Sequence, residues 1–473
     1  MRTPFLGSAY VSRSSNLAGQ RLINLYPEVV ETKSGKDTGA FYGCPGLDLL
    51  TICGNGPIRG MAIMASTLYV VSGNQVYSVS TSWIAALIGS ISTGPGYALT
   101  GPVSMIANET QLAIFDGVNG WLVTGGVLSQ LSLPFANPTM AAYQDTFGLC
   151  VQGGSNIVWQ SNVADISTWS ALNFSAINAQ PDPMVAIGQL HREMWMIGQW
   201  NTEIWQDAGN SGFAFSREQG IYVEWGCAAP YSLAKAGDSL IWLAQSMGGQ
   251  IKVVQTNGYQ ARRISTHAIE YAIGQYSKVS DAISYVYYQE GHEFYVITFP
   301  TGNATWVYDT TTEAWHQRAA LAGGVYNRHQ GNCAVSYGGQ VVVGDSLSGN
   351  LFAFDLNTTT DNGVTRKWLR SWRAVQAPPE YPMRFNNLQI DMQTGINVPD
   401  GTNPLVMLRW SDDGGHNWSN ERLWSAGAPG ETAKRVRFTR LGSTRRESGL
   451  DRMFELSSSD AFPVALIGAS INS

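Results

Sequence analysis

The chain has 473 residues, of which 44% are hydrophobic, 11% aromatic and only 14% charged. With 51 glycines and 16 tryptophans, this composition is typical of an all-β protein rich in turns, and it argues against coiled coils and disorder. The net charge of −6 excludes a globally basic nucleic-acid-binding protein. The charge is uneven, because residues 365–473 hold 14 lysines and arginines against 11 carboxylates, whereas the first 364 hold 15 against 24.

The chain shows no sign of secretion or membrane insertion. Its five cysteines are scattered and form no C-x-x-C pair, which favours buried free thiols in a protein folded in the reducing cytoplasm. The N-terminal residues lack the apolar stretch of a signal peptide. No apolar run approaches the roughly 18 residues of a membrane-spanning helix.

In chain order, residues 1–56 are expected to form an N-terminal arm with short strands. Residues 57–356 repeat one unit, in which an alternating strand, a glycine turn and a second strand end near an aromatic residue. The first unit contains the strands 60–63, 68–71 and 76–79. Units of four short strands that recur about every 40 to 50 residues predict a β-propeller-like body. The sequence contains seven such units, which predict seven blades, or six blades if one unit is a linker.

Three further elements complete the predicted organisation. Apolar residues at helical spacing predict a helix over 267–279, which Ser265 or Thr266 would cap. Residues 357–366 are polar and predict a linker. Residues 367–473 alternate again and predict a C-terminal β-sandwich domain.

The C-terminal domain contains one Asp-box, with the pattern S-x-D-x-G-x-x-W, at Ser411, Asp413, Gly415 and Trp418. Asp413 can accept hydrogen bonds from turn amides, Gly415 tolerates positive φ, and Trp418 can hold the turn against the protein. Sialidases carry several such boxes, but a single box outside the propeller predicts a structural turn rather than sialidase chemistry.

Other motifs suggest an esterase or a metal site only weakly. Residues 237–240 and 344–347 both read G-D-S-L, and Asp413 and His416 supply a D-x-x-H. An esterase would use Ser239 or Ser346 as its nucleophile. The motif occurs twice at a turn into a strand, without surrounding α/β alternation, so a structural role is favoured. The six histidines show no metal-ligand spacing, and no nucleotide-binding loop occurs.

A basic stretch in the C-terminal domain is the remaining candidate site. It is either a solvated strand face or a contact surface for an acidic partner protein. DNA binding is disfavoured because no aromatic residues interleave with the charges. The stretch consists of Lys434, Arg435, Arg437, Arg440, Arg445 and Arg446.

Several segments in order resemble one protein family. They are residues 21–28, 43–47, 179–182, 198–205, 264–270, 290–295, 305–309, 409–415 and 440–442. Together they are similar to the packaged-DNA-stabilisation proteins of short-tailed phages, also called tail accessory factors or tail hubs. The resemblance covers nearly the whole chain.

The resemblance implies a structural protein of the virion tail, made and assembled in the host cytoplasm. Such proteins form a six-fold homo-oligomeric ring below the portal and its adaptor ring. They extend the DNA channel, help to retain the packaged genome without reading its sequence, and dock tail fibres or tailspikes and a needle or plug. The family implies no catalytic residue, cofactor or metal, so we expect no enzyme.

Two other hypotheses remain open. A glycan-binding or glycan-cleaving propeller for host-receptor recognition is suggested by the aromatic-rich loops and the Asp-box. Cleavage needs paired carboxylates, for which Glu203, Asp207 and Glu224 are candidates. The G-D-S-L esterase is the third hypothesis.

Overall fold

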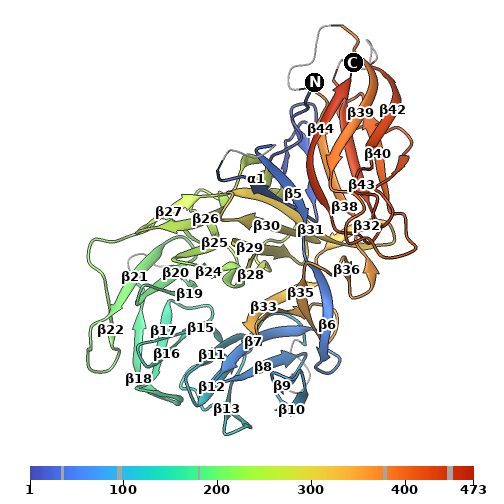
Figure 1. Ribbon diagram of the computed structural model, residues 1–473. Helices are drawn as coiled ribbons and strands as arrows, with labels where there is room; N and C mark the ends of the chain where they lie inside the picture. The colour runs from blue at the N-terminus through green and yellow to red at the C-terminus, as the bar shows by residue number, and fades with distance from the viewer. Residues whose placement is uncertain (33–36, 93–98, 179–181, 376–380, 445–450, 473) are drawn as a thin grey trace.

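The computed structural model describes residues 1–32, 37–92, 99–178, 182–375, 381–444 and 451–472. Among these residues almost all regular structure is β-strand, with a single α-helix, α1 (His267–Gly274). The strands form a ring of radial sheets and, beside it, a two-sheet unit (Figure 1). The prediction of an all-β protein with a propeller body and a C-terminal sandwich is confirmed.

The first four blades of the propeller are antiparallel four-stranded sheets that use consecutive strands. Blade 1 contains β7 (Ile58–Met64), β8 (Thr67–Ser72), β9 (Gln75–Val79) and β10 (Ala85–Ser90). Blade 2 contains β11 (Ser104–Ala107), β12 (Gln111–Phe115), β13 (Gly120–Thr124) and β14 (Val127–Gln130). Blade 3 contains β15 (Pro138–Gln144), β16 (Phe147–Gln152), β17 (Ile157–Asn162) and β18 (Asp165–Ala176). Blade 4 contains β19 (Met184–Leu190), β20 (Glu193–Gly198), β21 (Thr202–Asp207) and β22 (Phe215–Arg217).

Three further blades are less regular. Blade 5 contains β23 (Gly226–Cys227), β24 (Ala234–Ala236), β25 (Ser239–Gln245), β26 (Ile251–Asn257) and β27 (Gln260–Arg263), with a short 3-10 turn at Pro230–Ser232. Blade 6 contains β28 (Ile283–Gln289), β29 (His292–Phe299), β30 (Ala304–Asp309), β31 (Ala314–Ala322) and β32 (Val325–Arg328). Blade 7 contains β33 (Gly331–Tyr337), β34 (Gln340–Asp345), β35 (Asn350–Asp355) and, from the N-terminal region, β6 (Gly46–Ile52).

The propeller is a closed ring. The inner strands contact one another in succession, β7, β11, β15, β19, β24, β28 and β33, and β33 contacts β7 again. Blade 7 is completed by β6, which pairs antiparallel with β35. The described residues thus form seven blades, and strands from both ends of the body share the last one.

The C-terminal unit is a β-sandwich. One sheet has the order β38 (Trp368–Arg373), β43 (Met453–Ser458), β40 (Leu405–Ser411) and β41 (Arg422–Ser425). The other has the order β42 (Val436–Ser443), β39 (Arg384–Met392), β44 (Ala465–Asn472), β5 (Gly39–Gly43) and β4 (Leu25–Val29). Two of its strands therefore come from the N-terminal region.

Residues 1–56 do not stand apart as an arm. The short hairpin of β1 (Tyr10–Val11) and β2 (Gly19–Gln20) is followed by β3 (Leu22–Ile23), which pairs with β31 of blade 6 and with β38 of the sandwich. β4 and β5 extend the sandwich, and β6 closes the propeller. The N-terminal region therefore joins the two domains of its own chain.

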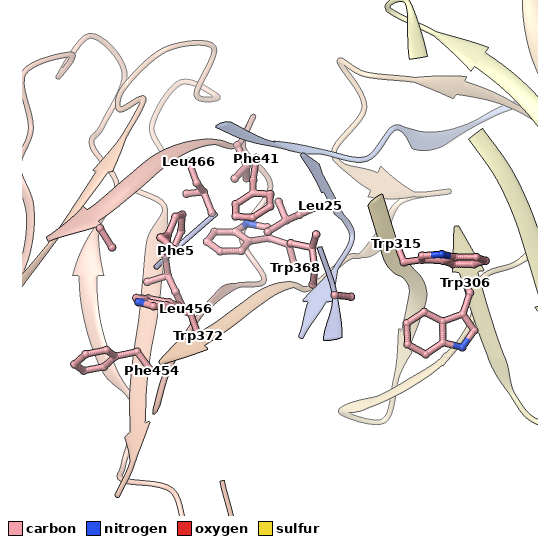
Figure 2. Packing of buried hydrophobic residues seen from close by; sticks show 14 of the residues in the cluster. Phe5, Leu25, Phe41, Trp306, Trp315, Trp368, Trp372, Phe454, Leu456 and Leu466 are labelled. Carbon is pink, nitrogen blue, oxygen red and sulfur yellow. The ribbon is translucent and has the colours of Figure 1, made fainter. Parts of the chain in front are cut away.

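A single apolar core crosses the junction of the two domains (Figure 2). Phe5 from the N-terminus is 2% exposed and packs edge-on against Trp372 of β38, with ring centroids 4.8 Å apart. The same buried cluster reaches Trp306 and Trp315 in blade 6. Continuous burial of this kind joins the domains more firmly than a polar inter-domain contact would.

The segment 357–366, predicted as a linker, contains two short strands. It carries β36 (Thr360–Asp361) and β37 (Val364–Thr365), and β36 runs parallel to β6. Asp361 is 4% exposed. Local composition could not show this, because the partner strand lies more than 300 residues away in the sequence.

Candidate functional site

The Asp-box forms a tight turn after β40. The Ser411 hydroxyl donates to Asp413 Oδ1 at 2.7 Å, and the amide of Gly415 donates to Ser411 Oγ at 2.8 Å. Asp413 also accepts the Asn417 amide at 2.8 Å, and these hydrogen bonds hold the pKa of its carboxyl below the usual range. Trp418 Nε1 donates to the Gly415 carbonyl at 2.9 Å. Gly415 has a φ of +94°, a conformation that favours glycine.

The residues around the Asp-box stabilise the turn by packing and by an ion pair. The Arg409 guanidinium lies 4.8 Å from the Trp418 ring centroid, and the N-terminal Asn16 packs so closely on Gly414 that no Cβ would fit there. Asp412 forms a two-pronged ion pair with the buried Arg452, with N–O distances of 2.6 and 2.7 Å. The turn therefore packs against the N-terminal segment, and both of its aspartates are engaged in local hydrogen bonds or an ion pair.

The basic stretch begins just before β42, an edge strand of the sandwich, and continues along it. Within β42, Val436 and Phe438 are buried, whereas Arg437 and Arg440 are exposed, as is Arg435 just before the strand. These three arginines make no ion pair with a carboxylate in the described residues, and Lys434 pairs only with Glu431, at 2.9 Å. Arg445 and Arg446 lie outside the described residues.

The G-D-S-L segment of blade 7 is a turn-forming device. Asp345 Oδ1 accepts the Leu347 amide at 2.9 Å, and Asp345 Oδ2 accepts the Ser348 hydroxyl at 2.6 Å. Asp309 and Asp355 make the equivalent pair of contacts at the ends of β30 and β35. Asp345 therefore stabilises a strand-end turn that recurs at Asp309 and Asp355.

The second G-D-S-L segment is no better suited to catalysis. The Ser239 hydroxyl donates to the Ala236 carbonyl at 2.9 Å and accepts from Gln255 Nε2 at 2.9 Å. In the part of the chain that the structure describes, neither Ser239 nor Ser346 is hydrogen-bonded to a histidine. A serine nucleophile needs such a base within hydrogen-bond reach.

The three carboxylates considered for glycan cleavage lie in different environments. Glu203 is completely buried, and it accepts a hydrogen bond from Trp205 Nε1 at 3.0 Å. Asp207 caps a turn by accepting the Gly209 amide at 2.9 Å. Only Glu224 is freely exposed. A buried carboxylate of this kind cannot protonate the leaving group of a bound sugar.

The described residues also offer no metal site and no membrane-spanning helix. These residues include no group of three His, Cys, Asp or Glu side chains placed to hold a metal ion. Four cysteines are buried as free thiols, and the fifth, Cys333, is partly buried. No helix in the described ranges is long and apolar enough to cross a membrane.

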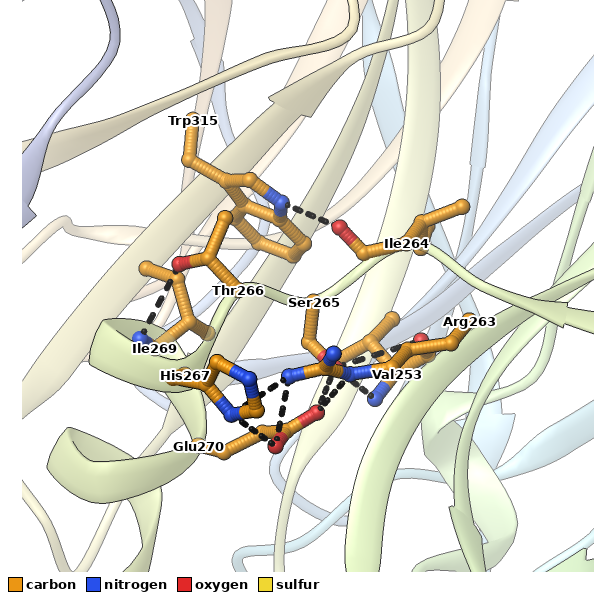
Figure 3. A network of polar contacts seen from close by, with 9 residues as sticks. All are labelled: Val253, Arg263, Ile264, Ser265, Thr266, His267, Ile269, Glu270 and Trp315. Atoms are coloured by element: carbon orange, nitrogen blue, oxygen red, sulfur yellow. Dashed lines mark hydrogen bonds and ion pairs between the residues drawn. The ribbon is translucent and has the colours of Figure 1, made fainter.

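The segment 264–270 forms a local polar network at the start of α1 (Figure 3). Glu270 pairs with Arg263 at 2.6 and 2.9 Å and accepts the Ser265 hydroxyl at 2.7 Å. Thr266 caps the helix by accepting the Ile269 amide. His267 is exposed and lies within 3.0 Å of Arg263. The helix ends at Gly274, shorter than the predicted range 267–279, and its contacts stabilise the edge of blade 5.

Sequence reasoning missed a pocket of about 430 Å³ between the propeller and the sandwich. Tyr26, Tyr42 and Phe462 line it, together with the carboxylates of Glu28 and Glu290. These residues come from both ends of the chain and from blade 6, so no local sequence signal identifies them. The guanidinium of Arg366 and the carboxylate of Asp460 also line this pocket.

An adjoining pocket of about 650 Å³ contains His292. The Nδ1 atom of His292 lies 2.7 Å from Oδ2 of the buried Asp309, and this hydrogen bond raises the pKa of His292. Glu28 and Glu31 line the same pocket. The two pockets together form an acidic surface at the domain junction.

The sheet topology defines a seven-bladed β-propeller with an appended β-sandwich. The propeller family of bacteriophage P22 Gp10 matches residues 1–359, and the β-sandwich family of the same protein matches residues 368–473. The chain therefore belongs to the bacteriophage P22 Gp10 family, and it is a structural protein of a phage virion tail.

Other comparisons are distant. A search of curated protein sequences found no match. The N-terminal domain of Nup159 has 8% identity and a TM-score of 0.41, covering 71% of this chain and 99% of its own. A streptogramin B lyase has 8% identity and a TM-score of 0.42, covering 65% and 97%. The Neurospora crassa Pan2 WD40 domain has 10% identity and a TM-score of 0.40, covering 63% and 89%.

Proposed function

We propose that this tail protein forms a homo-oligomeric, six-fold ring below the portal and its adaptor ring. The ring extends the channel through which genomic DNA passes, helps to retain the packaged genome, and docks tail fibres or tailspikes and a needle or plug. The observation that supports this proposal is the family match over both domains, combined with a rigid β body. The protein acts after its synthesis in the host cytoplasm.

The charge distribution is compatible with a DNA conduit. The first 364 residues carry 24 carboxylates against 15 lysines and arginines. A negative channel wall repels phosphates and lets DNA slide, whereas a basic wall would release counterions and hold the DNA. Because the wall would act on the phosphates alone, DNA would pass without recognition of its sequence.

The exposed surfaces suit protein–protein assembly. The arginines of β42 offer positive charge on one side of the sandwich, and the junction pockets offer carboxylates. Complementary charges on different faces of one subunit favour head-to-tail contacts between neighbouring subunits. Such contacts form a ring when the rotation from one subunit to the next closes on itself.

A depletion experiment tests the proposed function. Phage that lack the protein are expected to package DNA and then to lose it, and addition of the purified protein to freshly filled heads is expected to restore retention. The measurement is nuclease-sensitive DNA per filled head. Full retention without the protein, together with binding of the isolated protein to host polysaccharide, would instead support glycan recognition.

A further inference from the structure

One end of the propeller collects the first and third turns of its blades. Blades 1–3 are antiparallel meanders, so the turn after the first strand and the turn after the third strand lie at the same end of each sheet. Neighbouring blades contact one another at this end. Asn108 Nδ2, in the first turn of blade 2, donates to the carbonyl of Ala164, in the third turn of blade 3, at 3.4 Å. We refer to this end of the propeller as the turn face.

Over blades 1–3 the turn face exposes aliphatic side chains. Ile84, Val127 and Val163 are 68%, 65% and 66% exposed, and Ile63 is 36% exposed. These residues lie in or beside four different turns, where glycine, asparagine, aspartate and serine are the usual residues. Blades 1–3 are also on the side of the propeller away from the sandwich (Figure 1). An exposed aliphatic surface of this kind marks a protein contact.

The backbone of two of these turns also favours other residues than those present. Ala65 in blade 1 has a φ of +53°, and Ala164 in blade 3 has a φ of +54°. Glycine, asparagine and aspartate adopt this conformation more readily than alanine does. Both alanines are exposed, so packing inside the subunit does not explain them. Residues held in such conformations cluster at functional sites.

Blades 1–3 are depleted of charge. Residues 60–191 contain no lysine or arginine and only five carboxylates, whereas the whole chain has 29 basic and 35 acidic residues. Three of the five carboxylates are on the turn face. Asp145 pairs with Arg192 of blade 4 at 3.0 Å, Asp165 is held by hydrogen bonds, and Glu109 is exposed.

The turn face is charged over blades 4–6. The first or third turns of these blades carry Arg192, Asp238, Glu290 and Glu313. The side chain of Asp238 is 97% exposed, and that of Glu313 is 63% exposed. Depletion of charge distinguishes the core of a protein interface from the rest of a surface. The aliphatic half of the turn face therefore has the character of an interface core, and the charged half does not.

We propose that the turn face of blades 1–3 binds a charge-poor, apolar surface of a different virion protein. The inference rests on the proposed function, because the partner belongs to the same particle. Charge matching defines the chemistry of this partner, since charged groups brought against the aliphatic turns would lose water without gaining ion pairs.

A second copy of this chain fits the turn face less well. Contact of the aliphatic half with the charged half of a neighbouring subunit would bury unpaired charges. Contact of two aliphatic halves would be isologous, and an isologous contact pairs two subunits but does not close a six-fold ring. The partner is therefore a protein of different sequence.

Site-specific photo-cross-linking in purified virions is the direct test. The cross-linking residue benzoylphenylalanine replaces Ile84 or Val127 in the full chain, and mass spectrometry identifies the protein that is captured after irradiation. Both positions are expected to capture the same virion protein, different from this chain. Val118 is the matched control position, because it is 46% exposed in the second turn of blade 2, at the opposite end of the sheet. It should not capture that protein.

Charge insertion tests the same contact. The double variant Ile84→Lys/Val127→Lys changes only exposed side chains, so its Tm should stay within a few degrees of the wild type. It should lose its association with the captured protein, so that at least one of the two falls at least tenfold in purified particles. Val118→Lys should leave both at wild-type levels. Wild-type levels of both proteins in the double variant would contradict the inference.

The outcomes separate this inference from the proposed function. Capture of a second copy of this chain alone, or no capture from Ile84 and Val127 in particles that contain the chain, would overturn the inference and leave the proposed ring intact. Absence of the wild-type chain from virions would overturn both.

Discussion

At the scale of single residues, Arg452 illustrates how the sandwich tolerates a buried charge. Its side chain is almost fully buried, pairs with Asp412, and donates to the Leu441 carbonyl at 2.7 Å. It also lies 4.6 Å from the Phe385 ring centroid. Charge, hydrogen bonds and ring contacts are satisfied together, which is the condition for burying a guanidinium.

Arg452→Met should therefore destabilise the protein by about 3 kcal/mol or more, because Asp412 and the Leu441 carbonyl lose their partner. The measurement is urea unfolding followed by tryptophan fluorescence. Lys434→Met is the control, since the Lys434–Glu431 pair is at the surface and should contribute less than about 1 kcal/mol. Similar losses in the two variants would show that the buried network is not the source of stability.

Buried histidines set the response to acid. Burial lowers the pKa of His316 to about 3, and that of His329 lies well below its usual value. Below about pH 6.5 the unfolded chain binds protons that the folded chain does not, so stability falls as pH falls. His292 acts above this range, because the hydrogen bond to Asp309 raises its pKa. Its protonation therefore adds stability as the pH falls toward about 6.5, and its contribution stays constant below that value.

The Tm of the wild type should therefore decrease from about pH 6.5 to 4.5. His316→Leu removes one depressed group, so its Tm should fall less steeply over the same range. Thermal unfolding at a series of pH values measures both slopes. Parallel curves for the variant and the wild type would refute the assignment to His316.

At the scale of elements, the N-terminal segment is part of both domain cores. Phe5→Ala should cost about 3–5 kcal/mol, because the cavity lies against Trp372 and Phe41. Chemical denaturation of the variant measures this loss. Leu172→Ala on β18 is the control, since Leu172 is 82% exposed and its truncation should change stability by less than about 0.5 kcal/mol. A negligible effect of Phe5→Ala would mean that the segment is dispensable.

Local sequence patterns predicted most strands, whereas pairing over long distances was not predictable. The alternating strands predicted at 60–63, 68–71 and 76–79 correspond to β7, β8 and β9. The assignment of β3, β4, β5 and β6 to three different sheets rests on contacts hundreds of residues apart. The junction pockets and the burial of Arg318 could not be predicted either, because they also depend on contacts between distant segments. The Asp-box could be predicted because its residues are contiguous in the sequence.

At the scale of the whole molecule, the arginines of β42 are predicted to act in assembly rather than in folding. The double variant Arg435→Glu/Arg437→Glu changes only exposed side chains, so its Tm should stay within a few degrees of the wild type. Its incorporation into particles should fall at least tenfold if these charges meet an acidic partner surface. Quantitative blotting of purified particles measures incorporation. Normal incorporation would assign these charges to solubility alone.

The proposed function makes this chain a ring-forming component of the virion tail. Copy number by quantitative mass spectrometry on purified virions, measured beside the portal and adaptor proteins, is the most direct test. A six-fold ring predicts a fixed stoichiometry relative to those proteins. Absence from the particle, or a trimeric ratio that follows the fibres, would contradict it and would favour the receptor-recognition alternative.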